Sequence, residues 1–385
     1  MNDTSIEDTQ RMLSDSVRDY VQRGYGVAIR DASIAHQHGC TPARWAEFAE
    51  LGWLALPLPE QDEGLGGSMA EICAVVEGMG RGLVNEPFVP CAVLGAGLLS
   101  DVATGSLRAH WLPRIAQGKA RVACALWEPG AGFDHRAVST TAQANANSVY
   151  LLQGAKALVP GGAGADAYLL AAALRPGTWG LFLVPADAPG LTATTRSWYD
   201  GQKAAELQMS AVPAADLLQV GSEADIVALL DRAVDRAVIA HCAESVGVMQ
   251  GAFDTTLDYL KTRKQFGRVI AANQVVQHRM VDLMVEIEAA RALTQAAAAV
   301  LDDPMSTSTA RRRHTAAGRA CVALAAKHVW QESVQLHGAI GMTQEGPVGQ
   351  FVKRLATACT VYGSAESHLE ALARLALDGP PALAA

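Results

Sequence analysis

The stretch YLKTRKQFGRVIAANQVVQHRMVDLMVEIEAARAL, residues 259–293, decides the fold. Both of its ends follow a helical period, and the polar, glycine-containing segment between them separates two helices. The same period continues outward, so four multi-turn helices are predicted, over Ala224–Tyr259, Gln274–Leu301, Arg311–Leu336 and Val348–Leu377. Their Ala-rich faces suit the close approach of helices in an antiparallel bundle. We therefore predict a helical bundle over residues 221–385.

Upstream of the bundle the hydrophobic period changes to that of strands. Short apolar or β-branched runs are predicted as strands at Arg121–Leu126, Val149–Leu152, Tyr168–Ala173, Leu181–Val184, Leu191–Thr195 and Ala205–Met209. Turn-forming segments such as PGGAGAD and PADAPG separate them. This spacing favours a small barrel or sandwich over residues 121–220. No GxGxxG follows a strand into a helix, which disfavours a dinucleotide-binding α/β domain.

The first part of the chain, residues 1–120, is predicted to be a helical domain. Thr41 and Pro42 offer an N-cap and a proline at the first helical position, ahead of the run ARWAEFAELGW. Further helices are expected at Met69–Met79, Val93–Leu99 and Leu107–Gln117. The predicted fold class is thus mainly α with a central β domain.

Composition excludes several classes of protein. The 385 residues carry 39 acidic and 31 basic side chains, a net charge of −8, and half of the residues are hydrophobic, which argues against disorder and against a general nucleic-acid binder. The seven cysteines are scattered without a CxxC pair, so reduced core thiols are expected and no metal site. The polar N-terminus and the absence of a long uncharged apolar run predict a cytoplasmic protein without a membrane span.

Four strings in order narrow the function. Residues 259–293 resemble the signature of the acyl-CoA dehydrogenase flavoprotein family, in which R-x-x-F-G precedes a Gln and a QHRxAD-like helix. ALWEPGAGF, residues 125–133, resembles the middle-domain TEPGAGSD loop, and QLHGAIGMTQEGPVGQFVKRL, residues 335–355, resembles the late GGxG segment. GWLALPLPEQDEGLGG, residues 52–67, is similar to the exit of the family's N-terminal helices.

The resemblance implies an N-terminal helical domain, a middle β barrel or sandwich and a C-terminal four-helix bundle. It also implies FAD as cofactor, in a site shared by two subunits, and removal of hydrogen from the α and β carbons of an acyl-CoA. Electrons would pass to an electron-transfer flavoprotein or a similar acceptor, in lipid or steroid catabolism.

The cofactor-binding residues that the resemblance implies are Arg263, Phe266, Gln274, Gln335 and Gly338. A guanidinium suits the FAD pyrophosphate, Phe266 would cover the ligand, and a glycine admits it closely. The alternative for Arg263 is a surface basic residue that caps a helix C-terminus. Ala339 stands where the family usually has a second glycine.

The catalytic base stays unknown at this point. By resemblance a Glu is expected either after a tyrosine near the C-terminus or ten residues before the glycine of VGVMQ, and these places hold Gly363 and Ala237. Other carboxylates that could replace it are Glu244, Glu366 and Asp200, although each is expected to be an ordinary paired or solvated group. For His278 and His337 a structural role is favoured over metal binding or acid–base work.

The middle domain also departs from the family. Trp127 and Phe133 stand where the family has Thr and Ser, Leu158 replaces a Trp, and Pro160 replaces a hydroxyl residue and removes a backbone donor.

These departures lead to a hypothesis of a heteromer, such as a heterotetramer, in which this chain lends its FAD-binding residues to an unlike acyl-CoA dehydrogenase subunit. The string GMTQEGPVGQFVKRL resembles subunits of heteromeric bacterial relatives. The alternatives are a non-catalytic assembly subunit, or a flavin oxidase or monooxygenase of the same fold, for which no α-proton base is needed.

Overall fold

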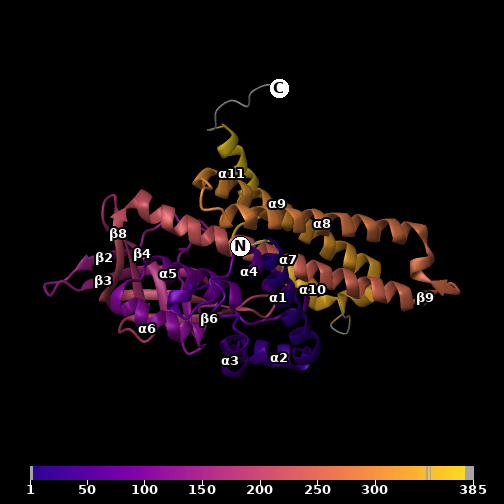
Figure 1. The fold of residues 1–385 in the computed structure, drawn as a ribbon, viewed down its shortest axis with the longest axis horizontal. Helices are drawn as coiled ribbons and strands as arrows, with labels where there is room; N and C mark the ends of the chain where they lie inside the picture. The colour runs from indigo at the N-terminus through magenta and orange to yellow at the C-terminus, as the bar shows by residue number, and fades with distance from the viewer. Residues whose placement is uncertain (1–2, 344–345, 347, 378–385) are drawn as a thin grey trace. The chain divides into compact units, whose positions relative to one another are not determined.

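The computed structural model describes residues 3–343, 346 and 348–377 (Figure 1). Residues 344, 345 and 347, which belong to the string GMTQEGPVGQFVKRL, lie outside the described residues. Contacts divide the chain into two compact units, each discontinuous in sequence: residues 1–26, 69–84 and 238–385 form one, and residues 27–68 and 85–237 form the other. We call them the bundle unit and the sheet unit. The domain ranges 1–120, 121–220 and 221–385 stay a prediction.

The first third of the chain is helical, as predicted. Its helices are α1 (Asp3–Gly24), α2 (Val27–Ala35), α3 (Pro42–Glu50), α4 (Met69–Arg81), the π-helix η2 (Val89–Ala96), α5 (Gly97–Val102) and α6 (Gly105–Ala116), with a 3-10 turn η1 (Glu60–Asp62). At α3 the Thr41 side chain accepts a hydrogen bond from the Arg44 backbone N–H at 3.3 Å, and Pro42 is the first helical residue. The predicted N-cap is confirmed.

The central part forms one sheet with the strand order β6-β7-β3-β2-β4-β5-β8, and β1 pairs with β4. The strands are β1 (Val122–Cys124), β2 (Thr141–Ala144), β3 (Tyr150–Pro160), β4 (Ala167–Arg175), β5 (Thr178–Pro185), β6 (Leu191–Ser197), β7 (Lys203–Ala214) and β8 (Asp216–Ser222). The sequence analysis did not predict β2 and β8, because β2 is largely exposed, β8 is only partly buried, and neither carries a regular apolar alternation.

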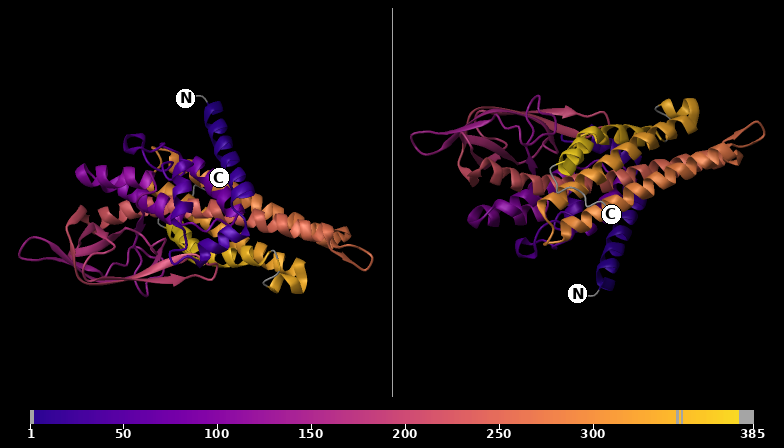
Figure 2. Two further views of the ribbon diagram at one scale, coloured as in Figure 1. Left: turned by 90° about the horizontal axis from the view of Figure 1, so that it is seen from below. Right: turned by 90° about the horizontal axis from the view of Figure 1, so that it is seen from above.

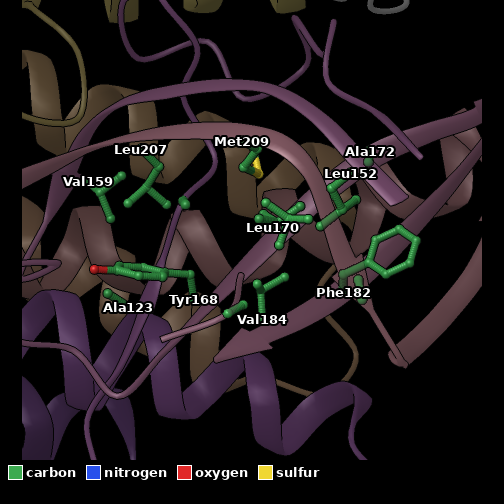
Figure 3. Packing of buried hydrophobic residues seen from close by; sticks show 14 of the residues in the cluster. Ala123, Leu152, Val159, Tyr168, Leu170, Ala172, Phe182, Val184, Leu207 and Met209 are labelled. Carbon is green, nitrogen blue, oxygen red and sulfur yellow. The ribbon is translucent and has the colours of Figure 1, made fainter. Parts of the chain in front are cut away.

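One face of this sheet encloses a core of interdigitated apolar side chains. Tyr168 and Leu170 of β4, Phe182 of β5 and Leu207 and Met209 of β7 are all buried there (Figure 3). The Tyr168 hydroxyl donates to the Gly162 carbonyl at 2.9 Å, so its one polar atom is satisfied.

An ion pair is buried in the sheet unit. The Lys156 Nζ lies 2.7 Å from the Glu128 Oε1 and also donates to the Ala171 carbonyl at 3.0 Å. Glu128 further accepts from the Thr140 hydroxyl at 2.6 Å and from the Ser139 hydroxyl. Burial raises the pKa of Glu128, but the ammonium and the hydroxyl donors outweigh it and bring that pKa to about 2. The Glu128–Lys156 bond therefore holds the WEPG loop, residues 127–130, against β3.

The C-terminal helices are α7 (Glu223–Thr262), α8 (Gln274–Asp302), α9 (Ser308–His337), α10 (Gly349–Ala358) and α11 (Ala365–Leu377). A hairpin of β9 (Lys264–Gln265) and β10 (Arg268–Val269), followed by the 3-10 turn η3 (Ile270–Ala272), joins α7 to α8, and a second such turn, η4 (Gly338–Met342), follows α9. Figure 2 shows the hairpin beyond the ends of α7 and α8.

The single helix predicted over Val348–Leu377 is wrong. The chain leaves the helix after α10, and Tyr362 and Gly363 have φ angles of 60° and 103° before α11 begins. The apolar period runs through this break, so periodicity alone does not reveal it. Among the described residues no helix is long and apolar enough to cross a membrane.

Glycines set the distance between α4 and α7 in the bundle unit. A Cβ on Gly80 would lie 2.1 Å from the Glu244 carbonyl oxygen, and a Cβ on Gly247 would lie 1.9 Å from the Glu77 carbonyl oxygen. The two backbones are therefore in direct contact, and any side chain at either glycine has to separate the helices.

We predict that Lys156→Met destabilises the protein by about 3–5 kcal/mol, because it leaves the Glu128 carboxylate buried without its cation. The Glu128→Gln/Lys156→Met double variant recovers a large part of this loss. Urea denaturation of each variant measures the free energy of unfolding. Arg196→Ala is the control, since the Arg196–Glu206 pair is exposed and its loss is expected to change the free energy of unfolding far less. Equal losses in the single and double variants would contradict the prediction.

We also predict an acid-labile sheet unit. The folded-state pKa of Glu128 lies below its ordinary value of 4.5, so its contribution to stability is present above pH 4.5 and is lost as the pH falls toward 2. Glu128→Gln should flatten this part of the curve of unfolding free energy against pH. A wild-type curve and a variant curve of the same slope over this range would contradict it.

Candidate functional site

The five predicted cofactor-binding residues all lie at one end of the bundle unit. Arg263 and Phe266 belong to the connection after α7, Gln274 is the first residue of α8, and Gln335 and Gly338 lie where α9 ends. All five are exposed. The sequence separates them by 75 positions, and the antiparallel course of α7, α8 and α9 brings their elements to the same end (Figure 1).

A ring stack joins the ends of α7 and α9 directly beside these residues. Tyr259 and His337 lie with ring centroids 4.5 Å apart and an interplanar angle of 19°. The Tyr259 hydroxyl donates to the His337 carbonyl at 3.3 Å. His337 is buried and its Nδ1 lies 2.8 Å from the Ser333 carbonyl, which agrees with the predicted structural role. Burial lowers the pKa of His337 and keeps the ring neutral.

The hairpin presents Phe266 to the exterior. The β9–β10 register pairs Gln265 with Arg268, so Phe266 and Gly267 form a two-residue turn, with φ angles of 51° and 79°. Positive φ at both central positions is the type I′ pattern, which strains an aromatic residue. Phe266 is nevertheless fully exposed, at 102%. Among the described residues, no side chain packs on the Phe266 ring to offset the cost of this conformation.

The same end of the bundle offers a cation and open backbone. Arg263 is exposed, and no carboxylate in the described part of the chain pairs with it. Gly338 has a φ of 66°, and a Cβ there would meet no atom within 4 Å. The first backbone N–H groups of α8, which begins at Gln274, add positive potential. Such an arrangement can bind an extended anion such as the FAD pyrophosphate, so the residues present fit the cofactor.

The first expected place of a catalytic glutamate, Gly363, lies in a tightly held turn. The Arg319 Nη2 donates to the carbonyls of Ala358, Val361 and Gly363 at 2.7, 2.9 and 2.8 Å. A Cβ on Gly363 would lie 2.8 Å from the His368 Nε2, and the φ of 103° favours glycine. Arg319 is fully buried, and sequence analysis gave no signal for it. This backbone is built for glycine.

Glu244, one of the carboxylates considered as a replacement, is committed to two partners. Its Oε1 accepts from the Arg354 Nη1 at 2.8 Å, and its Oε2 lies 3.2 Å from the His241 Nδ1. Burial opposes ionisation, but the His241 hydrogen bond and the Arg354 charge together lower the pKa of Glu244. Arg354 also donates to the Val84 carbonyl at 3.1 Å. His241 and Arg354 were missed by sequence analysis, although the His241–Glu244 spacing of three residues on a helix was a signal.

The two other carboxylates lie apart from this pair. Glu366 is exposed in the first turn of α11, where its own backbone N–H and the Ser364 hydroxyl lower its pKa. Asp200, in the sheet unit, is buried in the turn before β7 and accepts from the Gln202 backbone N–H at 3.1 Å.

In the part of the chain that the structure describes, the histidines and acids form no metal centre. His278 is exposed on α8. Within the described ranges no group of three or more His, Cys, Asp or Glu side chains could hold a metal ion.

The residues at which the middle domain departs from the family differ in their exposure. Trp127 is fully buried, its Nε1 donates to the Phe133 carbonyl at 3.0 Å, and the two rings meet edge to face with centroids 5.1 Å apart. Pro160 is buried and pairs with Ala204 of β7. Leu158 is partly exposed, with a φ of 50°. Trp127 and Phe133 thus pack against each other in the sheet unit.

The comparisons with known proteins agree across the whole chain. Three family models match it: the acyl-CoA dehydrogenase N-terminal domain over residues 7–119, the middle domain over 123–212 and the C-terminal domain over 229–377. Acyl-CoA dehydrogenase FadE12 of Mycobacterium tuberculosis is 30% identical over 395 aligned residues, which cover 99% of each chain.

Solved structures give the same result. The steroid acyl-CoA dehydrogenase Tcur3481-Tcur3483, in a variant form, has a TM-score of 0.86 and 29% identity over 97% of this chain and 99% of that chain. The ChsE4-ChsE5 complex of Mycobacterium tuberculosis has the same fold, with a TM-score of 0.85 and 24% identity over 97% and 98% of the two chains. The predicted fold class is confirmed. The chain therefore belongs to the acyl-CoA dehydrogenase family and is an oxidoreductase that uses FAD.

Proposed function

We propose that this chain is one subunit of a heteromeric acyl-CoA dehydrogenase, and that its bundle end completes an FAD site on an unlike subunit. The observation that carries the proposal is the contrast between two regions of the bundle unit. Arg263, Phe266, Gln274, Gln335 and Gly338 are all exposed at one end, whereas the turn expected to carry the base holds a glycine that cannot be replaced without strain.

The bundle end has the chemistry of an FAD clamp. Arg263 pairs with the pyrophosphate, and the charge of the phosphates is further neutralised by the α8 N-terminus at Gln274. Phe266 covers the ligand, and burial of its exposed ring offsets the cost of its positive φ. Gln335 and Gly338 approach the adenosine portion. FAD, when bound, supplies the acceptor for the hydride that leaves the substrate β carbon.

Two facts support an unlike partner. The Trp127 and Phe133 side chains, which replace hydroxyl residues of the family, are engaged with each other. The relative Tcur3481-Tcur3483, at 29% identity, carries a name that joins two proteins and is described as a steroid enzyme. The proposed substrate is an acyl-CoA from lipid or steroid breakdown, with an electron-transfer flavoprotein or a similar protein as acceptor.

The test is purification of the chain with and without the product of a neighbouring acyl-CoA dehydrogenase-like reading frame. We expect the pair to bind FAD and to reduce an electron acceptor on addition of acyl-CoA, and the chain alone to be colourless. A chain that is yellow alone and is reduced by acyl-CoA overturns the proposal. A pair without flavin indicates an assembly subunit, and a pair that consumes dioxygen in place of the acceptor indicates an oxidase; both outcomes contradict it.

Arg263→Ala should weaken FAD binding by the pair by about tenfold to a hundredfold, because charge-assisted hydrogen bonds contribute about 1.5–3 kcal/mol. Titration of the apo pair with FAD measures the dissociation constant. The matched control is Arg268→Ala on the same hairpin, whose guanidinium bonds to the Asn273 Oδ1 at 2.5 Å. Equal weakening by both variants would mean that the hairpin acts only through its general charge.

Restoring the glutamate at residue 363 should not create an active site. Gly363→Glu places a Cβ against His368 and forces a side chain to a φ of 103°, so we expect a loss of about 1–3 kcal/mol in unfolding free energy and no gain in dehydrogenation. Gly177→Ala is the control for φ alone, because Gly177 has a φ of 74° and open space around it. A stable Gly363→Glu variant with higher activity would contradict the prediction.

A further inference from the structure

A buried polar cluster in the bundle unit has no part in the proposed clamp. It consists of His241 and Glu244 on α7, Arg354 on α10 and Tyr362 in the turn before α11. The Glu244 carboxylate uses one oxygen for Arg354, at 2.8 Å, and the other for the His241 Nδ1, at 3.2 Å. The His241 ring meets the Tyr362 ring edge to face, with centroids 5.4 Å apart. His241 is only 5% exposed.

The hydrogen bond fixes which ring nitrogen of His241 carries the proton. A carboxylate only accepts, so the Nδ1 of His241 donates to Glu244 and the lone pair of the neutral ring is on Nε2. That Nε2 is buried and has no hydrogen-bond partner in the part of the chain that the structure describes. A buried acceptor without a donor costs free energy, which a partner from outside the chain, a water molecule or a ligand, would offset.

The position of His241 is informative as well. It lies four residues after Ala237 on the continuous helix α7, and residues at this spacing share one helix face. Its ring touches Tyr362, the residue before Gly363. His241 thus lies one helical turn from Ala237, one of the two places where a glutamate was expected. It also contacts Tyr362, which precedes the other such place, Gly363.

We propose that His241 is the proton acceptor for the α carbon of an acyl thioester bound at this chain, in place of the missing glutamate. In this step the α C–H bond breaks, its proton forms the Nε2–H bond of an imidazolium, and the electron pair stays on the thioester as an enolate. In the complete oxidation, for which FAD would supply the acceptor of the β-carbon hydride, this pair forms the Cα–Cβ double bond. Glu244 and Arg354 are positioning residues: the carboxylate holds the ring and balances the new charge, and Arg354 holds the carboxylate.

The inference rests on the proposed function for its substrate class alone, because proton removal from the α carbon needs no flavin. Three charged or titratable groups belong to the surroundings of His241: Glu244, which binds its Nδ1, Tyr362, whose ring it meets, and Arg354, which binds Glu244. The rival imidazole is His368 on α11, whose Nε2 lies 2.9 Å from the Tyr362 carbonyl. The His368 Nε2 donates its proton to that carbonyl, so this nitrogen is less available as a proton acceptor than the Nε2 of His241.

The experiment measures exchange of the substrate α hydrogens with D2O, followed by NMR or mass spectrometry. The complex of the chain with its partner is used, with any catalytic glutamate of the partner changed to glutamine, so that exchange reports on this chain. The probes are butyryl-CoA, octanoyl-CoA and a steroid side-chain CoA thioester. We expect exchange with at least one probe, and a loss of about a hundredfold or more in His241→Gln, in keeping with the usual contribution of a general base.

Two variants serve as controls. His278→Gln changes an exposed histidine on α8, and His368→Gln removes the rival imidazole; both should exchange within about threefold of the parent complex. Glu244→Gln should slow exchange and leave thioester binding unchanged, which a purely structural defect would not do. Each variant is compared by thermal unfolding, and His241→Asn provides a second neutral substitution if His241→Gln folds poorly.

The proposal is overturned if no probe exchanges, if folded His241→Gln exchanges like the parent, or if only His368→Gln loses exchange. FAD content and acceptor reduction are recorded on the same preparations. Loss of FAD binding with exchange retained contradicts the proposed function and leaves His241 as the base. FAD-dependent oxidation without exchange at this chain contradicts the His241 assignment alone.

Discussion

The direct contact of α4 with α7 is the constraint on which the bundle unit depends. Gly80 and Gly247 each face a carbonyl oxygen of the other helix at a distance that no Cβ can occupy. The position of α7 follows from this contact, and α7 carries Glu244 and His241 as well as the path to Arg263. A substitution at either glycine would therefore disturb two regions of the unit that share no side chain.

Buried charge is the second organising feature. Lys156 and Glu128 in the sheet unit and Arg354 and Glu244 in the bundle unit are pairs, and each has further hydrogen bonds that repay part of the desolvation cost. Arg319 differs, because its hydrogen bonds go to three backbone carbonyls. In each case the charge fixes a loop or turn that no regular hydrogen-bond ladder could hold. Burial of these charges costs free energy, and the hydrogen bonds that accompany it define the backbone geometry of the loops and turns.

The sequence allowed the order of helical, β and helical segments to be predicted, because the period of apolar residues differs between them. It also identified the exposed end of the bundle, since Arg263, Phe266 and Gln274 belong to one continuous string. Periodicity failed at the turn of Tyr362 and Gly363, where the apolar pattern continues although the backbone leaves the helix. It also missed β2, which is largely exposed, and β8, which is only partly buried.

The cluster around His241 could not be predicted for a different reason. Its members come from two helices and a turn that are up to 121 positions apart in the sequence, and no local pattern connects them. Glu244 alone was noticed, and its partners became visible only when the fold brought Arg354 and His241 to its two oxygens. Long-range ion pairs of this kind depend on tertiary packing.

The exposed, strained Phe266 has a consequence for how the protein is made. A chain synthesised without a binding partner presents an aromatic ring on a turn whose cost is offset by no contact among the described residues. The unfavourable turn lowers the stability of the unbound chain, and a less stable chain is captured more often by chaperones and proteases. Selection would then act on the balance of synthesis between this chain and whatever covers the ring, and surplus chains would be degraded.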